Sequence, residues 1–249
     1  MPPDSVSRDV VSFVRRGPRM NPSQQRAWDR LRDRYVVEIP TGERETSIAA
    51  QATLDLGEVF GRQAPLFVEI GIGSGETICE LAGRFPAANL LGFEVFLPTV
   101  ASCLARLEQA NVDNVRIIVA DGQQGVETLF SAGMGAIAEL WTFFPDPWPK
   151  KRHHKRRLVN PAFAQIVAQR LAVGGRWRLA TDWESYADWM REVLDDTAGL
   201  VNEYAEHGWA PRWEARPITK FEQRGINAGR TIRELSYLNP GAAQVSDSA

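Results

Sequence analysis

Cysteine is scarce in this chain, which carries two cysteines, Cys79 and Cys103, among 249 residues. Two thiols cannot form the disulfide framework of a small secreted domain or a zinc site of the usual four-cysteine kind. Both lie in segments with a helical pattern, where a cysteine without a partner usually packs in the core. We therefore expect neither a disulfide framework nor a metal site.

Long apolar runs are absent as well. No stretch of the sequence approaches the roughly 20 apolar residues that a membrane-spanning helix requires. Residues 1–5 lack the basic-then-apolar pattern of a secretory signal. We expect a cytoplasmic protein without a membrane partner. The hydrophobic content of 44% is enough to bury the core of one large α/β domain.

A net excess of one charge is also missing, because the formal net charge is −2. The cationic residues are nevertheless concentrated in two segments. Eight arginines and three aspartates give residues 8–34 a local charge of +5, and residues 150–157 carry +6, so the rest of the chain carries −13. Two cationic segments on an acidic body can form one face that binds a polyanion.

Short apolar runs alternate with helical stretches from residue 66 onward. The pattern predicts strands at 66–70, 90–93, 115–119, 137–144, 176–180 and 231–238. It predicts helices at 76–85, 97–109, 122–130, 161–171 and 184–197. We expect Gly174 and Gly175 to end the helix at 161–171. This alternation indicates a parallel sheet wrapped by helices, with ligands at the carboxyl ends of the strands.

The segment before the first strand is less regular. A basic helix is predicted at 24–34, after Pro22 and with Ser23 as its cap. Residues 35–64 contain scattered glycine and proline, so we expect irregular linking structure that includes one helix.

A glycine-rich turn closes the first strand and opens the first helix. Residues 69–75 read Glu-Ile-Gly-Ile-Gly-Ser-Gly, and Gly71, Gly73 and Gly75 would let a ligand approach backbone amides at a helix N-terminus. A dinucleotide fingerprint would need its third glycine at position 76, which is Glu76. The spacing instead resembles motif I of S-adenosylmethionine-dependent methyltransferases. Another nucleotide fold or a tight structural turn are the alternatives.

Acidic residues mark successive strand ends. Glu69 lies on the first strand, Glu94 ends the second and Asp121 follows the third. A carboxylate at the second strand end can accept both hydroxyls of a ribose, and one after the third can accept from the adenine amine. Each alone would be an ordinary exposed acid, but the three together suit one adenosine ligand.

The most unusual segment is residues 143–149, Phe-Phe-Pro-Asp-Pro-Trp-Pro, which leads directly into the basic residues 150–157. Prolines on both sides stiffen the backbone around Asp146. An acid beside a flat aromatic can hold a base, and the basic run can hold the attached phosphates. We interpret the segment as the reaction loop of an enzyme that acts on a nucleic-acid base. The alternative is a turn followed by a solvated basic face. Trp148 either stacks on a base or packs as an anchor of the loop.

With these motifs and the segments 180–182 (Ala-Thr-Asp) and 219–222 (Thr-Lys-Phe-Glu), the chain resembles the bacterial tRNA (guanine-N7)-methyltransferases. These enzymes methylate guanine 46 in the variable loop of tRNA. The resemblance covers roughly residues 10–238. It implies a Rossmann-like class I methyltransferase fold, α/β, with a central, mostly parallel seven-stranded sheet flanked by helices. We divide the chain into a basic N-terminal arm with linking helices (1–64), a methyltransferase domain (65–239) and a disordered tail (240–249).

The resemblance also implies partners and residue roles. The partner is tRNA, the cofactor is S-adenosylmethionine, and the protein is a monomer or homodimer without a metal. Asp146 is implied to be catalytic and to lie near the cofactor, which Glu69, Glu94 and Asp121 bind. The residues implied to bind the substrate are Lys150, Asp182, Thr219, Lys220, Phe221 and Glu222. Those implied to bind RNA are Arg152, His153, His154, Lys155, Arg156 and Arg157.

The chemistry of guanine supports these roles. N7 already presents a lone pair, so attack on a sulfonium methyl group requires aim rather than a strong base. A carboxylate can stabilise the positive charge that forms on the purine and can accept from its N1–H and amino groups. Asp146, Asp182 and Glu222 are the candidates. Their alternative roles are a turn cap, a helix N-cap, and a surface ion pair with Lys220 or Arg224.

Three further alternatives remain open. Arg15, Arg16 and Arg19 form either a disordered basic arm or an arm that closes over RNA and cofactor. A base-amine methyltransferase would also place an acid or amide beside prolines and an aromatic, although residues 146–148 lack its consecutive second proline. A cofactor-binding RNA chaperone would show no turnover at all.

Overall fold

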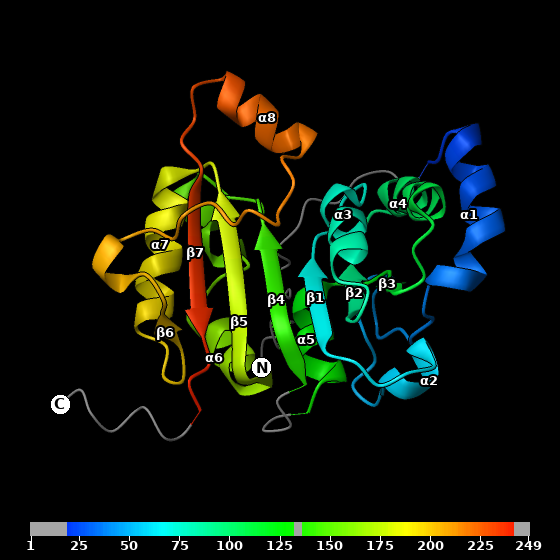
Figure 1. Ribbon diagram of the computed structural model, residues 1–249, viewed down its shortest axis with the longest axis horizontal. Helices are drawn as coiled ribbons and strands as arrows, with labels where there is room; N and C mark the ends of the chain where they lie inside the picture. The colour runs from blue at the N-terminus through cyan, green and yellow to red at the C-terminus, as the bar shows by residue number, and fades with distance from the viewer. Residues whose placement is uncertain (1–18, 132–135, 242–249) are drawn as a thin grey trace, which may run out of the picture.

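The computed structural model describes residues 19–131 and 136–241. Its described part contains a seven-stranded sheet in the order β3-β2-β1-β4-β5-β7-β6, with helices on both faces (Figure 1). The strands are β1 (Leu66–Ile70), β2 (Asn89–Phe93), β3 (Val115–Ile118), β4 (Ile137–Phe143), β5 (Leu171–Thr181), β6 (Val201–Asn202) and β7 (Arg233–Leu238). The first five run parallel, and β7 is antiparallel to both of its neighbours. This confirms the Rossmann-like class I methyltransferase fold, and the strand order reverses between β1 and β4.

The helices fall into two layers. They are α1 (Pro22–Tyr35), α2 (Leu56–Phe60), α3 (Glu76–Arg84), α4 (Leu97–Ala110), α5 (Gly122–Leu129), α6 (Pro161–Arg170), α7 (Glu184–Asp195) and α8 (Lys220–Asn227), with short 3-10 turns at Lys151–Arg156 and Ala205–His207. Apolar residues of α1, α3 and α4 share one buried cluster, and those of α5, α6 and α7 share the other. None of the helices in the described ranges is long and apolar enough to cross a membrane.

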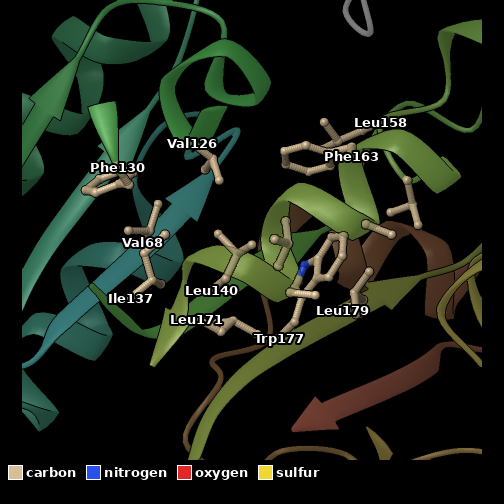
Figure 2. Packing of buried hydrophobic residues seen from close by; sticks show 14 of the residues in the cluster. Val68, Val126, Phe130, Ile137, Leu140, Leu158, Phe163, Leu171, Trp177 and Leu179 are labelled. Atoms are coloured by element: carbon tan, nitrogen blue, oxygen red, sulfur yellow. The ribbon is translucent and has the colours of Figure 1, made fainter. Parts of the chain in front are cut away.

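The two clusters exist because neighbouring strand residues point to opposite faces of the sheet. Leu90 joins the cluster under α3 and α4, whereas Leu91 joins the cluster under α5 to α7. Figure 2 shows the second cluster, in which Phe163 packs near Trp177 and Leu179 of β5. The Phe163 and Trp177 rings meet edge to face at 5.7 Å. Both faces of the parallel strands are therefore covered, as such a sheet requires.

The cap predicted for the first helix is wrong. Asn21, not Ser23, caps α1: its side chain accepts from the Gln24 N–H, and the Gln24 side chain accepts from the Asn21 N–H, both at 2.9 Å. Pro22 then occupies the first helical position, where its missing N–H costs no hydrogen bond. The linking segment also pairs with the sheet, because Val37 N–H donates to the carbonyl of Ile117 at the β3 edge.

The predicted end of α6 is also wrong. The helix ends at Arg170, and Gly174 and Gly175 lie inside β5, where the register against β4 shifts between Ile137 and Glu139. A Cβ at Gly175 would lie 2.8 Å from two backbone carbonyl oxygens. The glycine is therefore needed because backbone segments approach closely here, and it does not end a helix. The short β6 and α8 were not predicted from the residue pattern. The arm residues 1–18, with Arg15 and Arg16, and the tail residues 242–249 lie outside the described part.

Candidate functional site

A cavity of about 260 Å³ opens at the carboxyl edge of the sheet, beside the point where the strand order reverses. Its walls come from the turns that follow four successive parallel strands. Gly71 and Gly73 follow β1, Glu94 follows β2, Asp121 follows β3 and Asp146 follows β4. The cavity therefore joins the glycine turn, two of the strand-end acids and the reaction loop, as the sequence predicts for a ligand site.

The glycine turn needs its glycines for two different reasons. Gly71, Gly73 and Gly75 all have positive φ, at 80°, 53° and 78°, which other residues rarely adopt. A Cβ at Gly75 would also lie 2.2 Å from the sulfur of Cys103, whereas Gly71 and Gly73 face open space. Gly75 thus packs α3 against α4, while Gly71 and Gly73 keep the cavity wall bare.

Glu94 holds this turn in place. Its Oε2 accepts from the Gly73 N–H at 2.9 Å, and its Oε1 accepts from the N–H groups of Val95 and Phe96 at 2.8 and 3.0 Å. A carboxylate has about four acceptor positions. Three are used by the backbone, so Glu94 couples the shape of the glycine turn to any ligand that takes the fourth.

Asp121 has a similar double use. Its Oδ1 accepts from the Gln123 N–H at 2.9 Å and caps α5, while the residue lines the cavity. Burial raises the pKa of Asp121 above its usual value, although hydrogen bonds from the backbone oppose this effect. The same carboxyl group therefore fixes the start of α5 at the cavity wall.

Glu69 lies behind the cavity wall rather than on it. The residue is 4% exposed, and its Oε2 has no hydrogen-bond partner among the described residues. Burial, followed by repulsion from Glu94, raises the pKa of Glu69 to about 8. The side chain is therefore a protonated carboxyl group at neutral pH that a nearby cation would ionise.

The reaction loop is strained at two positions. Phe144 and Trp148 have positive φ values of 52° and 43°, which are uncommon for bulky residues. Phe144 N–H donates to the carbonyl of Ala180 at 2.7 Å, which ties the start of the loop to β5. Asp146 lies between the two strained residues, is exposed, and lines the cavity. The loop therefore holds one carboxylate at the cavity mouth.

Arg157 supports this loop from below. The residue is 2% exposed, its Nε donates to the carbonyl of Pro147 at 3.0 Å, and its guanidinium lies 4.8 Å from the centre of the Tyr186 ring. Burial raises the pKa of Tyr186, and the negative charge of Asp146 contributes. These contacts argue against the predicted RNA contact of Arg157, because a buried guanidinium cannot reach a phosphate.

The rest of the basic run faces outward. Lys150, Lys151, Arg152 and Lys155 are exposed, and three residues are partly buried: His153, His154 and Arg156. The Arg156 guanidinium lies 4.8 Å from the centre of the Trp148 ring, and His153 meets the same ring edge-on at 5.7 Å. These contacts favour Trp148 as an anchor of the loop. Partial desolvation and the neighbouring cations Arg152 and Arg156 lower the pKa of His153.

Helix α8 brings the 219–222 segment to the same edge of the sheet (Figure 1). The Thr219 hydroxyl caps the helix by accepting from the Glu222 N–H at 3.1 Å. The Lys220 N–H donates to Oε2 of Glu76 at 2.7 Å, beside the glycine turn. The Phe221 ring lies 5.4 Å from the ring of Phe144. The segment thus lies between the glycine turn and the reaction loop.

The two other candidate carboxylates are already paired with arginines. Asp182 does not cap α7, because the N-cap of that helix is Trp183. Instead, Oδ2 of Asp182 accepts from Nη1 of Arg230 at 2.6 Å. Glu222 forms no surface ion pair with Lys220 or Arg224; it is 1% exposed and binds Arg216 through both oxygens, at 2.6 and 2.9 Å. These two alternative roles are therefore wrong.

Arg216 and Arg230 are the residues that sequence reasoning missed. Both lie close in sequence to the 219–222 segment, but the charge pattern does not distinguish a buried arginine from a solvated one. The described residues contain no group of three or more histidine, cysteine, aspartate or glutamate side chains that could hold a metal ion. Cys79 and Cys103 are buried and free.

The chain is similar in sequence to several known proteins. A family model described as "Putative methyltransferase" matches residues 63–235. A tRNA (guanine-N(7)-)-methyltransferase of Cutibacterium acnes is 51% identical over 235 residues, which cover 94% of this chain and 84% of that protein. One from Nocardioides sp. is 44% identical over 237 residues, covering 95% and 90%. Among solved structures, the antibiotic-resistance methyltransferase Kmr superposes with a TM-score of 0.49 at 16% identity, covering 82% of this chain and 99% of that chain.

Proposed function

Because this chain belongs to the tRNA (guanine-N(7)-)-methyltransferase family, we propose that it transfers the methyl group of S-adenosylmethionine to N7 of a guanine in tRNA. The observation that carries the proposal is the cavity that joins the glycine turn, Glu94, Asp121 and Asp146 at one edge of the sheet. By the family resemblance, the guanine is at position 46 of the variable loop. The protein acts in the cytoplasm as a monomer or homodimer.

The described residues suit S-adenosylmethionine in charge and in hydrogen bonding. Glu94 has one acceptor position left for the ribose, and Asp121 lines the cavity and can accept from an adenine amine. Glu69 offers a buried carboxyl group whose Oε2 has no hydrogen-bond partner in the described part of the chain, which suits a cationic ligand. When bound, the cofactor supplies a methyl group on a positively charged sulfur.

We expect alanine at Glu94 or at Asp121 to weaken cofactor binding. Each change removes an acceptor for the adenosine half, and loss of a charged hydrogen bond costs about tenfold or more in affinity. Calorimetric titration with S-adenosylmethionine measures this directly, and tRNA binding should survive. Glu127→Ala, an exposed carboxylate on the helix that Asp121 caps, is the matched control. Unchanged cofactor affinity in both site variants would contradict these assignments.

Cofactor binding is expected to depend on pH through Glu69. Its pKa of about 8 means that the side chain is protonated at neutral pH, and a cationic cofactor favours the ionised form. Binding therefore releases a proton below about pH 8, and affinity rises as the pH approaches that value. Calorimetry in buffers of different ionisation enthalpy counts the released proton. Glu69→Gln should bind more weakly and lose this pH dependence; an unaltered proton count in the variant would refute the role.

The arrangement of carboxylates favours Asp146 as the catalytic one. Asp146 lines the cavity, whereas Asp182 and Glu222 are not among the residues that line it. Attack by N7 needs no proton removal, so the loop contributes by holding the guanine in line with the methyl group. The Asp146 carboxylate accepts from the base and stabilises the positive charge that develops on the purine. Phe221, which is 53% exposed and contacts Phe144, provides a face on which the base can stack.

The proposed function is tested by the identity of the methylated nucleoside. The protein is incubated with methyl-labelled S-adenosylmethionine and bulk tRNA lacking its own methylation, and the digested nucleosides are separated. Label in 7-methylguanosine is the expected result. Label in a nucleoside methylated on an exocyclic amine would indicate a base-amine methyltransferase, and cofactor binding without label would indicate a chaperone.

A further inference from the structure

We propose that Arg216 is a positioning residue that fixes helix α8, and with it the substrate segment 219–222, over the carboxyl edge of the sheet. The inference deepens the proposed function and rests on it, because the segment matters through the tRNA guanine. Arg216 is not on the cavity wall and acts through its neighbours.

Arg216 joins three parts of the molecule. Its side chain is fully buried, and it bonds Glu222 of α8 through both terminal nitrogens, at 2.6 and 2.9 Å. The same guanidinium donates to Oε1 of Glu234 in β7 at 2.6 Å. It also lies 5.3 and 5.4 Å from the ring centres of Phe143 and Phe144, where β4 leads into the reaction loop. One side chain thus connects the substrate helix, an inner strand of the sheet and the loop that carries Asp146.

Helix α8 has little apolar packing to replace this link. Its buried residues are Glu222 and Gly225, whereas Phe221 and Ile226 are 53% and 41% exposed. A helix of eight residues is not stable alone in water. Its position therefore depends on polar contacts with the body of the protein.

Two more of these contacts lie at the ends of α8. Lys220 N–H binds Glu76 at the start, and Arg230, just after the helix, binds Asp182. Gly225 lets the helix lie directly on Asp182, since a Cβ there would be 3.1 Å from the carboxylate oxygen. The ion pair between Arg216 and Glu222 is buried and contacts α8 between these two ends. This ion pair therefore sets how α8 lies against Phe144.

Arginine is required at position 216 because the guanidinium meets two carboxylates at once. A planar fork can bind Glu222 bidentately and still reach Glu234, whereas an ammonium group is a single point charge. Arg212 braces the arrangement: its Nη2 donates to the Arg216 carbonyl at 2.6 Å, and its Nε lies 3.7 Å from Glu222. With Arg216 shortened to lysine, Glu222 would be buried with incomplete pairing, which favours displacement of α8.

The first test compares Arg216→Lys with Arg84→Lys, a matched change in an exposed ion pair with Glu80. Arg216→Lys should lower kcat/KM for tRNA by roughly 10- to 100-fold, the size of effect that misplaced reacting groups produce. Its Kd for S-adenosylmethionine, measured without tRNA, should stay within about twofold. Unchanged tRNA kinetics in a folded Arg216→Lys protein would overturn the proposal.

A double-variant cycle separates positioning from independent action. If Arg216 acts through Glu222, adding Glu222→Gln to Arg216→Lys should cost little beyond either single change, because both disrupt one unit. If the fold losses in kcat/KM of the two single variants multiply in the double variant, the two residues act separately and the inference is refuted.

Hydrogen exchange gives a second measurement that does not require activity or a folded Arg216 variant. In Glu222→Gln, amides of residues 220–227 should lose protection relative to the wild type, while amides of β1 and β4 keep theirs. Equal protection in both proteins, or no protection of α8 in the wild type, would overturn the proposal. A wild-type protein that fails to methylate tRNA would instead refute the proposed function, and the exchange result would still decide the role of Arg216.

Discussion

Replacing Asp146 by alanine is expected to abolish most methyl transfer while leaving the fold intact. The side chain is exposed at the cavity mouth, so its loss removes no core packing. Loss of one preorganised electrostatic contact commonly costs about 10²-fold or more in rate. Single-turnover measurement of methyl transfer at saturating tRNA and cofactor gives the rate, and circular dichroism with thermal unfolding checks the fold.

Two companion variants sharpen this test. Asp146→Asn keeps the size of the side chain and an acceptor oxygen but removes the charge, so a comparable loss would assign the effect to charge. Asp188→Ala removes a carboxylate that is 58% exposed on α7 and should leave the rate unchanged. Near-normal turnover by folded Asp146→Ala would eliminate Asp146 as the catalytic residue.

Removing three cations from the basic run should have the second largest effect. The combined change of Arg152, Lys155 and Arg156 to alanine is expected to raise the KM for tRNA far more than the KM for S-adenosylmethionine. Phosphates are bound through charge, whereas the cavity is lined by the ends of the strands. The slope of log affinity against log salt should fall by about one for each phosphate contact removed, up to about three in total.

Arg157 stays unchanged in this variant because it supports the Pro147 backbone from a buried position. Arg84→Ala, on α3, is the control for removal of a surface cation. If the triple variant keeps the wild-type affinity and salt slope, the run is a solvated face. The RNA surface would then be sought among the arginines of α1, such as Arg26.

Much of the fold follows from local pattern. β1 lies where its five apolar-rich residues predict it, and the other parallel strands and their helices differ from prediction mainly at their ends. This works because strands covered on both faces read as short apolar runs. The exceptions have identifiable causes. Helix α8 has only two large apolar residues, Phe221 and Ile226, and Gly174 and Gly175 accommodate a register shift that no local signal marks.

The site divides in the same way. The glycine turn and the acids Glu94 and Asp121 were predictable because parallel strands place their carboxyl ends at one edge. The burial of Arg157 and Arg216 was not predictable, since an arginine that turns inward has the same sequence context as one that faces water. Tertiary contacts with Tyr186, Glu222 and Glu234 determine those two positions.

The position of methylation on the tRNA tests the central claim most directly. An unmodified tRNA transcript with guanine at position 46 is incubated with the protein and S-adenosylmethionine, reduced with borohydride and treated with aniline, which cuts the chain at 7-methylguanosine. The account predicts one enzyme-dependent cut, at position 46, that disappears when S-adenosylmethionine is omitted. Methyl groups incorporated into the transcript without any cut would show that N7 of guanine is not the acceptor and would contradict the account.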